Sequence, residues 1–410
     1  MNILAIETSC DETAVCVMHA DGDIGEATFT VRGNALFSQT EIHKQYGGVF
    51  PSMAKREHAQ NLGPLLQAAL TEAELFNESP HELTNDQLHL IERLLSREPQ
   101  LARNLAQLFE RIEKPDIDVI AVTTGPGLEP ALWVGVNAAR TLALIWDIPV
   151  IPTNHLEGHI VSSLVKQIDD VTFVAKDVEF PILGLIISGG HTEIVHMHDW
   201  HNYERIGMTR DDAVGEAYDK VGRMLDLPYP GGVHIARLAE EARSEDLDSP
   251  FEFPRPMLTN DDLDFSFSGL KTSVMYALKK WKTENGDLTD EVKKQVALSF
   301  EEAVRDVLVG KVKRALQNSD AKTLVVGGGV SANKRLREDF TLLMQEQFPD
   351  VSLSFSDPKI ATDNAIMIGM AGAMRVEHAI HPGDHEFEEV RADGEMKLSM
   401  SGSHVTGADQ

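Results

Sequence analysis

The sequence predicts an α/β protein built from two lobes of similar core topology. Residues 3–22 and 182–199 each read as an apolar strand, a small polar turn and a second strand. Residues 118–144 and 323–339 each read as a strand, a glycine-rich turn and a helix. Strands that alternate with helices are typical of α/β folds, and the repeated hairpin indicates an internal duplication.

Four segments follow from this pattern. We expect a first lobe over 1–150, a second lobe over 151–370, and a C-terminal helix region with a disordered acidic tail over 371–410. A helical hairpin over 72–115 interrupts the first lobe. Its two apolar stripes, which we expect to pack on each other or on the lobe rather than on a partner, are Leu88, Ile91, Leu94, Leu95 and, after Pro99, Leu101, Leu105, Leu108, Phe109, Ile112.

Composition narrows the class of protein. The chain has 410 residues, two cysteines and no apolar run near the ~18 residues that a membrane span needs, so a cytoplasmic protein is expected. Its net charge of −28 argues against broad adhesion to nucleic acid. Basic residues nevertheless outnumber acidic ones over 271–337, which leaves either a local basic face or solvated helix surfaces.

Glycine-rich turns after strands are the first candidate ligand site. Residues 186–192 and 325–333 place backbone N–H groups where no Cβ blocks a phosphate, and 229–232 adds a third turn of this kind. Tight turns need glycine for conformational reasons as well, so each turn alone is weak evidence. None matches the P-loop or Rossmann spacing, so these two nucleotide-binding motifs are excluded.

An acidic turn and a histidine pair are the next candidates. Glu7, Asp11 and Glu12 either form an exposed acidic tip or hold Mg²⁺ beside a nucleotide. His155 and His159 stand four residues apart and so share a helix face, where they either chelate a metal or lie on the surface.

The histidine pair does not fit a zinc peptidase. That motif needs glutamate directly after the first histidine, whereas Leu156 stands there and Glu157 falls roughly 200° around the helix from His155. A third ligand is still required, and Asp363 before a helix of small residues is a candidate. Two histidines and an aspartate suit Fe²⁺ or Zn²⁺ and leave positions open for substrate oxygens.

These motifs together resemble the bacterial-type tRNA N6-adenosine threonylcarbamoyltransferase family, once described as glycoproteases. The matching stretches include "IETSCDET", "NHLEGH", "ISGGHTE", "GGGVSANKRLR" and "TDNAIMIG", and they cover nearly the whole chain apart from residues 71–115 and the tail. The resemblance implies an actin-like ATPase fold, with two lobes of duplicated ribonuclease H-like topology around a cleft. It implies a metal held by His155, His159 and Asp363, and threonylcarbamoyl-adenylate held by Ile186, Ile187, Ser188, Gly189, Gly190, Asp219, Gly232 and Asn333.

The resemblance also implies the reaction and its partners. The threonylcarbamoyl group would pass to N6 of adenosine 37 in ANN-decoding tRNAs, and AMP would leave. Asp11 and Glu12 are the candidates for a general base. A smaller actin-like paralogue, a P-loop ATPase and a separate adenylate-forming enzyme would be needed for turnover.

Three other functions are weighed against this one. An actin-like phosphotransferase would explain the glycine turns but leaves the histidine pair without a role. A non-catalytic scaffold of the same fold predicts no metal, although all three proposed ligands are present. A peptidase is the poorest fit, because Glu157 is misplaced on the helix.

Overall fold

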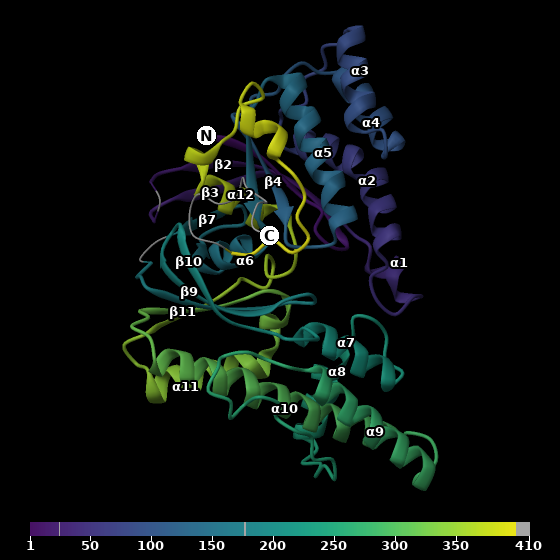
Figure 1. Cartoon of the computed structure of the whole chain (residues 1–410), viewed down its shortest axis with the longest axis vertical. Coiled ribbons are helices and arrows are strands. Elements are labelled where there is room, and N and C mark those ends of the chain that lie inside the picture. The colour runs from purple at the N-terminus through teal and green to yellow at the C-terminus, as the bar shows by residue number, and fades with distance from the viewer. Residues whose placement is uncertain (24, 176–177, 399–410) are drawn as a thin grey trace. The chain divides into compact units, whose positions relative to one another are not determined.

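The computed structural model describes residues 1–23, 25–175 and 178–398 of the chain. The chain divides into two compact units (Figure 1). Unit 1 consists of Met1–Gln39, Val49–Val178 and the chain from Asp357 onward, and unit 2 consists of Thr40–Gly48 and Glu179–Ser356. Each unit contains one mixed β-sheet with helices packed on it, so the predicted α/β architecture is confirmed.

The sheet of unit 1 is built around a buried central strand. In order along the sheet its strands are β5 (Val150–Asn154), β4 (Val119–Gly125), β1 (Asn2–Glu7), β2 (Glu12–Asp21), β3 (Thr28–Ser38), β7 (Thr172–Ala175) and β6 (Val165–Gln167). The strands β1, β2 and β3 pair antiparallel, whereas β4 and β5 run parallel to β1. Both β1 and β4 are buried along their whole length, as expected for strands covered on both faces.

Helices cover both faces of this sheet. On one face Leu4 and Ile6 pack in the core with α2 (Pro51–Glu72) and α5 (Glu129–Trp146). On the other face Ala5 lies against α12 (Ala365–Ala373), which packs on α6 (His155–Leu164). Alternate residues of β1 therefore face different helix layers, as the pleat of a strand requires.

The predicted helical hairpin is present in unit 1. It consists of α3 (Asn85–Leu94) and α4 (Pro99–Phe109). Thr84 opens α3 with a capping box in which its side chain and that of Gln87 bond reciprocally to backbone N–H groups. Ile91, Leu105 and Phe109 are buried in the core that α2 and α5 share, which confirms that the apolar stripes pack on the lobe.

Unit 2 repeats the strand order of unit 1. Its sheet runs β10 (Asn202–Met208), β9 (Thr192–Asp199), β8 (Ile182–Ile187), β11 (Thr323–Gly327), β12 (Ser352–Phe355). The strands β8, β9 and β10 pair antiparallel, and β11 and β12 run parallel to β8. Both units thus have the ribonuclease H-like order in which the first strand is central, and the predicted duplicated, actin-like fold is confirmed.

The helices of unit 2 come from both of its chain segments. They are α1 (Thr40–Lys44), α7 (Val214–Met224), α8 (Gly231–Ser244), α9 (Ser268–Asn285), α10 (Asp290–Gln317), α11 (Lys334–Gln347) and the short 3₁₀ helix η1 (Gly329–Ala332). Phe265, Phe267, Phe300 and Phe340 are fully buried in the hydrophobic core of unit 2.

The units divide at places other than the expected boundaries at 150 and 370. The segment from β5 to β7 extends the sheet of unit 1, and the chain returns to unit 1 at Asp357. The helix α6 is therefore part of unit 1, because it follows a strand that hydrogen-bonds to β4. No single residue number separates the lobes, since unit 2 is inserted within unit 1.

The end of the chain packs back on unit 1. After α12 come two 3₁₀ helices, η2 (Val376–His378) and η3 (His385–Glu389), rather than a longer helix. Phe387 and Val390 are buried in the core of unit 1. The predicted acidic tail over 399–410 lies outside the described residues. Among the helices described, none combines the length and the apolar character that a membrane span requires.

Candidate metal centre and substrate loop

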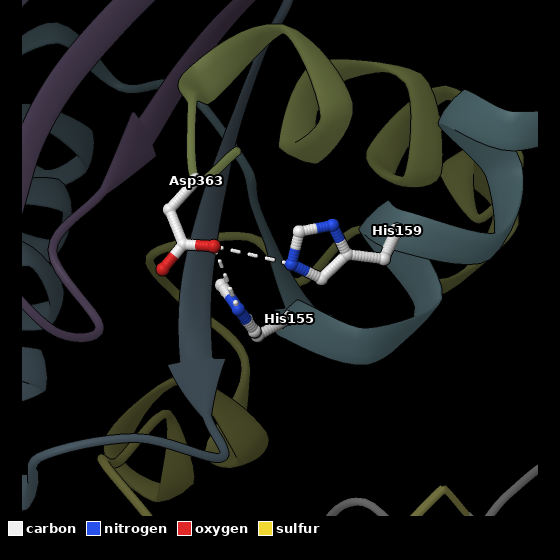
Figure 2. Close-up of side chains that lie close together, drawn as sticks. All are labelled: His155, His159 and Asp363. Carbon is white, nitrogen blue, oxygen red and sulfur yellow. Dashed lines mark hydrogen bonds and ion pairs between the residues drawn. The ribbon is translucent and has the colours of Figure 1, made fainter. Parts of the chain in front are cut away.

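His155, His159 and Asp363 lie together in unit 1, as Figure 2 shows. The Nε2 atom of His159 is 3.1 Å from Oδ1 of Asp363, and Nε2 of His155 is 3.4 Å from the same oxygen. Both histidines are almost fully buried, whereas the side chain of Asp363 is 21% exposed. The structure therefore brings together the three predicted metal ligands, of which Asp363 is the most exposed.

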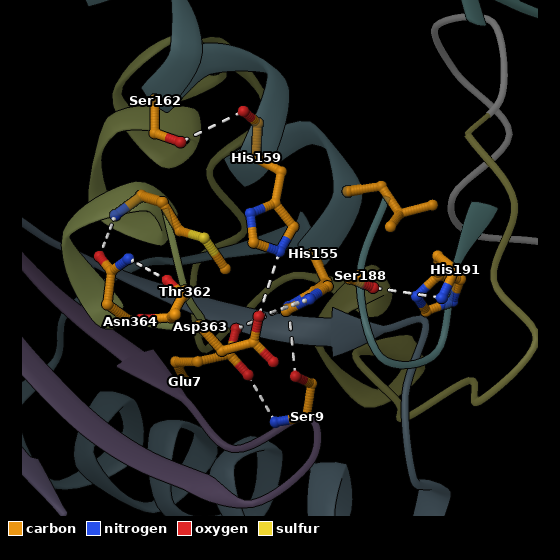
Figure 3. A network of polar contacts seen from close by, with 12 residues as sticks. Glu7, Ser9, His155, His159, Ser162, Ser188, His191, Thr362, Asp363 and Asn364 are labelled. Atoms are coloured by element: carbon orange, nitrogen blue, oxygen red, sulfur yellow. Dashed lines mark hydrogen bonds and ion pairs between the residues drawn. The ribbon is translucent and has the colours of Figure 1, made fainter. Parts of the chain in front are cut away.

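Two helix starts position these ligands (Figure 3). Asn154 caps α6, because its side chain accepts the N–H of Leu156 at 2.9 Å, and this fixes His155 in the first turn. Asn364 caps α12 by accepting the N–H of Met367 at 3.0 Å, and Asp363 directly precedes it. His155 and Asp363 thus stand at the N-termini of two helices. The partial positive charge of a helix N-terminus favours the carboxylate of Asp363.

The donor set fits a divalent ion. Donors held about 2.1 Å from one ion lie about 3.0–3.4 Å apart in octahedral or tetrahedral geometry, and the two measured separations fall in this range. The three ligand atoms all lie within 4.8 Å of one another. Two imidazoles and one carboxylate suit Fe²⁺ or Zn²⁺ and leave coordination positions for substrate.

Glu7, at the end of β1, holds His155 from the other side. Its Oε2 is 3.1 Å from Nδ1 of His155 and also accepts the Thr123 hydroxyl at 2.6 Å. Its Oε1 accepts the N–H of Ser9 at 2.5 Å. A carboxylate at Nδ1 favours the proton on that nitrogen and leaves Nε2 free to bind a metal. Glu7 therefore supports His155 within the candidate metal centre.

Burial and the neighbouring charges act against each other on the pKa values of this group. Burial raises the pKa of Asp363, but the two imidazoles outweigh burial and hold it well below its usual range. Burial lowers the pKa of His155, yet Asp363 and Glu7 together raise it well above its ordinary value. Burial dominates for His159, whose pKa is lowered. The two carboxylates thus favour positive charge between them, which a bound cation supplies when His155 is neutral.

Glu157 points away from the three ligands. Both of its carboxylate oxygens accept from Nε of Arg375, at 2.7 and 2.6 Å, and both side chains are buried. A peptidase of the H-E-x-x-H type needs its glutamate at the metal-bound water. The position of Glu157 confirms that the histidine pair does not form such a site.

The charge of Asp363 also acts on Glu12, in the rest of the acidic turn. Burial and the neighbouring carboxylates of Asp11 and Asp363 raise the pKa of Glu12 well above its usual value. Glu12 accepts the Ser38 hydroxyl at 3.0 Å, and Asp11 is 8% exposed. The predicted exposed tip is therefore wrong for these residues. The alternative, a Mg²⁺ site made by all three acids, is not favoured either, because Glu7 is engaged with His155.

The predicted substrate loop lies in unit 2, at the end of β8. Ile186 and Ile187 close the strand, and the Ser188 N–H donates to the His191 carbonyl at 2.9 Å, so it is already used. A Cβ on Gly189 or Gly190 would meet no atom within 4 Å. Packing within the described residues therefore does not require glycine at these two positions, and their backbone is open to a ligand.

Neighbouring elements pack closely against this loop. A Cβ on Gly215, in the first turn of α7, would lie 2.5 Å from the Ser188 carbonyl oxygen. A Cβ on Gly328 would lie 2.5 Å from the Ile187 carbonyl oxygen, and Gly328 has φ of +86°. Both glycines are needed for packing. Their close approach places the N-terminus of α7 beside the substrate loop, where it favours a phosphate.

The other three predicted substrate residues also lie in unit 2, and two of them have structural partners. Asp219 on α7 accepts the N–H of Gly231 at 2.7 Å, at the start of α8, where Gly232 follows. Asn333 caps α11 by accepting the Leu336 N–H and donates to Glu301 at 2.8 Å. Ligand contacts of Asn333 are thereby restricted to its second amide hydrogen and spare lone pair.

Sequence reasoning missed several supporting residues. It assigned Glu7 to a nucleotide-bound cation rather than to His155, and it gave no role to Thr123 or Arg375. The one available signal was that Glu7 ends an apolar strand, where side chains of parallel neighbours meet. No sequence pattern indicated a pairing between Glu157 and Arg375, which are far apart in the chain.

Comparison with known proteins gives one consistent family. The family model described as tRNA N6-adenosine threonylcarbamoyltransferase matches residues 30–81 and 98–370. The chain is 38% identical over 383 residues to the protein of that name from Staphylococcus carnosus, covering 93% of each. It is 40% identical over 370 residues to the one from Staphylococcus aureus, covering 90% of each.

Solved structures show weaker likeness. A full-length HypF structure aligns with 68% of this chain and 42% of its own at 12% identity and a TM-score of 0.45. Component A of (R)-2-hydroxyglutaryl-CoA dehydratase from Acidaminococcus fermentans aligns with 92% of this chain at 12% identity and a TM-score of 0.43. At these scores the strand order, and not the likeness, is what assigns the fold.

Proposed function

The chain belongs to the tRNA N6-adenosine threonylcarbamoyltransferase family, and on that premise we propose that it acts on adenosine 37 of ANN-decoding tRNAs. The threonylcarbamoyl group of threonylcarbamoyl-adenylate passes to N6 of that adenosine, and AMP leaves. The grouping of His155, His159 and Asp363 is the observation that carries this proposal, because a kinase of the same fold has no use for it.

Enzymes of this family depend on a metal, and the identity of the ion is part of the proposal: Fe²⁺, with Zn²⁺ as the alternative. His155, His159 and Asp363 hold it, and Glu7 fixes the tautomer of His155. When bound, the ion supplies a Lewis acid and an anchor for substrate oxygens. A second ion, Mg²⁺, would accompany a nucleotide rather than occupy these ligands.

We assign the adenylate to the open end of β8 in unit 2. The N–H groups of Gly189 and Gly190 donate to the phosphate, aided by the N-terminus of α7. Ile186, Ile187 and Ser188 hold this loop at the end of the strand. The other contacts come from Asp219 at the ribose hydroxyls and from Gly232 and Asn333 at the nucleoside.

The transfer forms a bond between N6 and the carbamoyl carbon and breaks the bond from that carbon to the AMP phosphate oxygen. The exocyclic amine is a weak nucleophile, so most of the rate comes from orientation and charge stabilisation. Its proton passes to a carboxylate, for which Asp11 and Glu12 are the candidates. Retained transfer in both the Asp11→Asn and Glu12→Gln variants would exclude this assignment.

The partners in the proposal are tRNA, a smaller actin-like paralogue, a P-loop ATPase and a separate adenylate-forming enzyme, all in the cytoplasm. tRNA follows directly from the family. The hairpin of α3 and α4 packs with α2 and α5, so any partner that docks on this side of unit 1 meets the hairpin.

Nucleoside mass spectrometry tests the proposal. Unmodified tRNA is incubated with the full chain, threonylcarbamoyl-adenylate and the bacterial partner proteins. The wild type should form threonylcarbamoyladenosine, and the double variant His155→Ala/His159→Ala should not. The matched control, His81→Ala/His89→Ala, removes two exposed histidines of the helical hairpin region and should remain active. If neither the wild type nor the control forms product when folded and loaded with metal, the proposed activity is rejected.

A further inference from the structure

Part of the basic stretch over 271–337 is neutralised by ion pairs within unit 2. Lys271 pairs with Asp212 at 2.8 Å, and Lys294 pairs with Glu245. Arg335 pairs with Asp339 at 3.2 Å. Because neighbouring carboxylates neutralise these three basic side chains, the three contribute little attraction for a polyanion.

The outer side of α9 is different. Lys279, Lys280 and Lys282 are exposed, and within the described residues none of them forms an ion pair. Met275 and Tyr276 on the same helix are 41% and 62% exposed. Met275, Lys279 and Lys282 are spaced four and three residues apart, so they line one stripe of the helix. This helix thus presents unpaired positive charge beside exposed aromatic and thioether groups.

That stripe borders a groove between α7 and α9. A cavity of about 410 Å³ is lined by Met224 of α7 and by Met275, Leu278, Lys279, Lys282 and Thr283 of α9. Its floor is apolar and its rim is cationic. A groove of this composition fits a ligand with flat apolar faces and anionic links, which describes a nucleic acid strand.

A second cavity of about 570 Å³ is also lined in part by α7. Arg223, the residue before Met224, lines it together with Lys44, Tyr46 and Asp219. A Cβ on Gly47 would lie 2.7 Å from Nε of Arg223, so glycine lets the guanidinium lie over this loop. Tyr46 is half exposed. Both cavities are thus lined in part by α7, and one of them includes the substrate residue Asp219.

We propose that these two cavities and their rim, the α7–α9 face, are the docking surface for the tRNA substrate. The face is defined by Tyr46 and Arg223 of one cavity, Lys279 and Lys282 of the other, and the exposed Tyr276 and Lys280 of α9. The inference rests on the proposed function, since it names where that substrate binds. With a net charge of −28, the chain as a whole repels tRNA, so a face that gathers exposed basic side chains is where tRNA can dock. Exposed tyrosines stack with unpaired bases of an RNA loop.

Charge reversal with a matched control tests this inference. The variant Lys279→Glu/Lys282→Glu is compared with Lys322→Glu/Lys334→Glu, which makes the same charge change at two exposed lysines elsewhere in unit 2. Binding of full-chain protein to unmodified tRNA is measured by fluorescence anisotropy over a range of salt concentrations. The first variant should bind at least tenfold more weakly, with a log–log salt slope reduced by about 2, and the control should stay within about twofold of wild type.

A second variant separates stacking from charge. Tyr276→Ala should weaken tRNA binding severalfold and leave the salt slope unchanged, because no phosphate contact is lost. Affinity for AMP and metal content should be unchanged in all three variants, which excludes general unfolding. Equal weakening in the charge-reversal variant and its control, or wild-type affinity in Lys279→Glu/Lys282→Glu, would overturn the inference.

The outcome also distinguishes this inference from the proposed function. If the wild type forms threonylcarbamoyladenosine and Lys279→Glu/Lys282→Glu forms it at the same rate at low tRNA concentration, the face is wrong and the function stands. If the wild type neither binds tRNA nor forms product, the function itself fails, and the inference fails with it.

Discussion

At the scale of single residues, Glu7 decides how His155 presents its ring. The Glu7→Gln substitution keeps the shape but removes the negative charge that holds the proton on Nδ1. We expect the affinity for Fe²⁺ or Zn²⁺ to fall by roughly 10–100-fold, the usual cost of losing such a support. Competition with a chromophoric chelator measures this affinity directly and needs no enzyme assay.

Thr123→Val is the control for that variant. It removes one donor to Glu7 at 2.6 Å but keeps the contact between Glu7 and His155. Its effect on metal affinity should be clearly smaller. Equal losses in the two variants would mean that Glu7 acts through the packing of the strand ends and not through the charge at His155.

The metal centre shows what residue patterns could and could not reveal. The spacing of His155 and His159 predicted a shared helix face, and the structure confirms it. Asp363 lies far along the chain, and only the motif around it suggested that it meets the pair. Glu7 was singled out for the wrong partner, because a carboxylate at a strand end can turn toward several neighbours and sequence does not record which.

At the scale of elements, the ion pair of Glu157 and Arg375 joins α6 to the end of α12. Both side chains are buried, at 1% and 4% exposed, so each charge depends on the other. Glu157→Gln leaves a buried guanidinium uncompensated and should lower the free energy of unfolding by about 3–5 kcal/mol. Because α6 carries two of the ligands and Asp363 directly precedes the cap of α12, metal affinity should fall as well. Urea unfolding and chelator competition measure the two effects.

Two comparisons make that prediction specific. Arg140 and Glu388 form a pair in the same unit with one partner 74% exposed, so Glu388→Gln should cost no more than about 1 kcal/mol. The double variant Glu157→Leu/Arg375→Met removes both charges and should regain most of the lost stability. A double variant as unstable as Glu157→Gln would indicate that packing, and not charge, is what matters.

The start of α9 depends on one aspartate. Asp211 accepts the N–H groups of Phe267 and Ser268 at 2.8 and 3.1 Å, and the hydroxyls of Ser266 and Ser268 at 2.6 Å. Burial raises the pKa of Asp211, but these hydrogen bonds outweigh burial and hold it below its ordinary value. A carboxyl group with a lowered folded-state pKa stabilises the protein above its unfolded pKa of about 3.9, and that stability is lost as pH falls below this value.

Asp211→Asn should therefore cost about 1 kcal/mol near pH 7, because the group is exposed and partly screened, and the cost should shrink toward pH 3. Urea unfolding at several pH values, followed by tryptophan fluorescence, measures this dependence. Asp287→Asn, at an exposed position after α9, is the control. A destabilisation that stays constant from pH 7 to pH 3 would contradict the assignment to the charged carboxylate.

At the scale of the whole molecule, the duplicated strand order was foreseeable and the division of the chain was not. Two similar hairpins at 3–22 and 182–199 were enough to predict two related lobes. The return of the chain to unit 1 at Asp357 left no local signal, because it depends on which faces of β1 and β4 need covering. The glycines of α12 meet Ala5 and Ala121, and such close packing is a property of the folded sheet.

This division predicts where the metal changes the stability of the chain. All three ligands belong to unit 1, and none of them lies in the segments of unit 2. A ligand stabilises the structure that binds it, by about 2.7 kcal/mol at a hundredfold excess over Kd. Hydrogen–deuterium exchange of metal-loaded and chelated protein should therefore show stronger protection of α6 and the start of α12, with β8, β9 and α10 unchanged. In His155→Ala/His159→Ala the difference should vanish. Equal protection of both units by the metal would mean that the two units open as one cooperative structure.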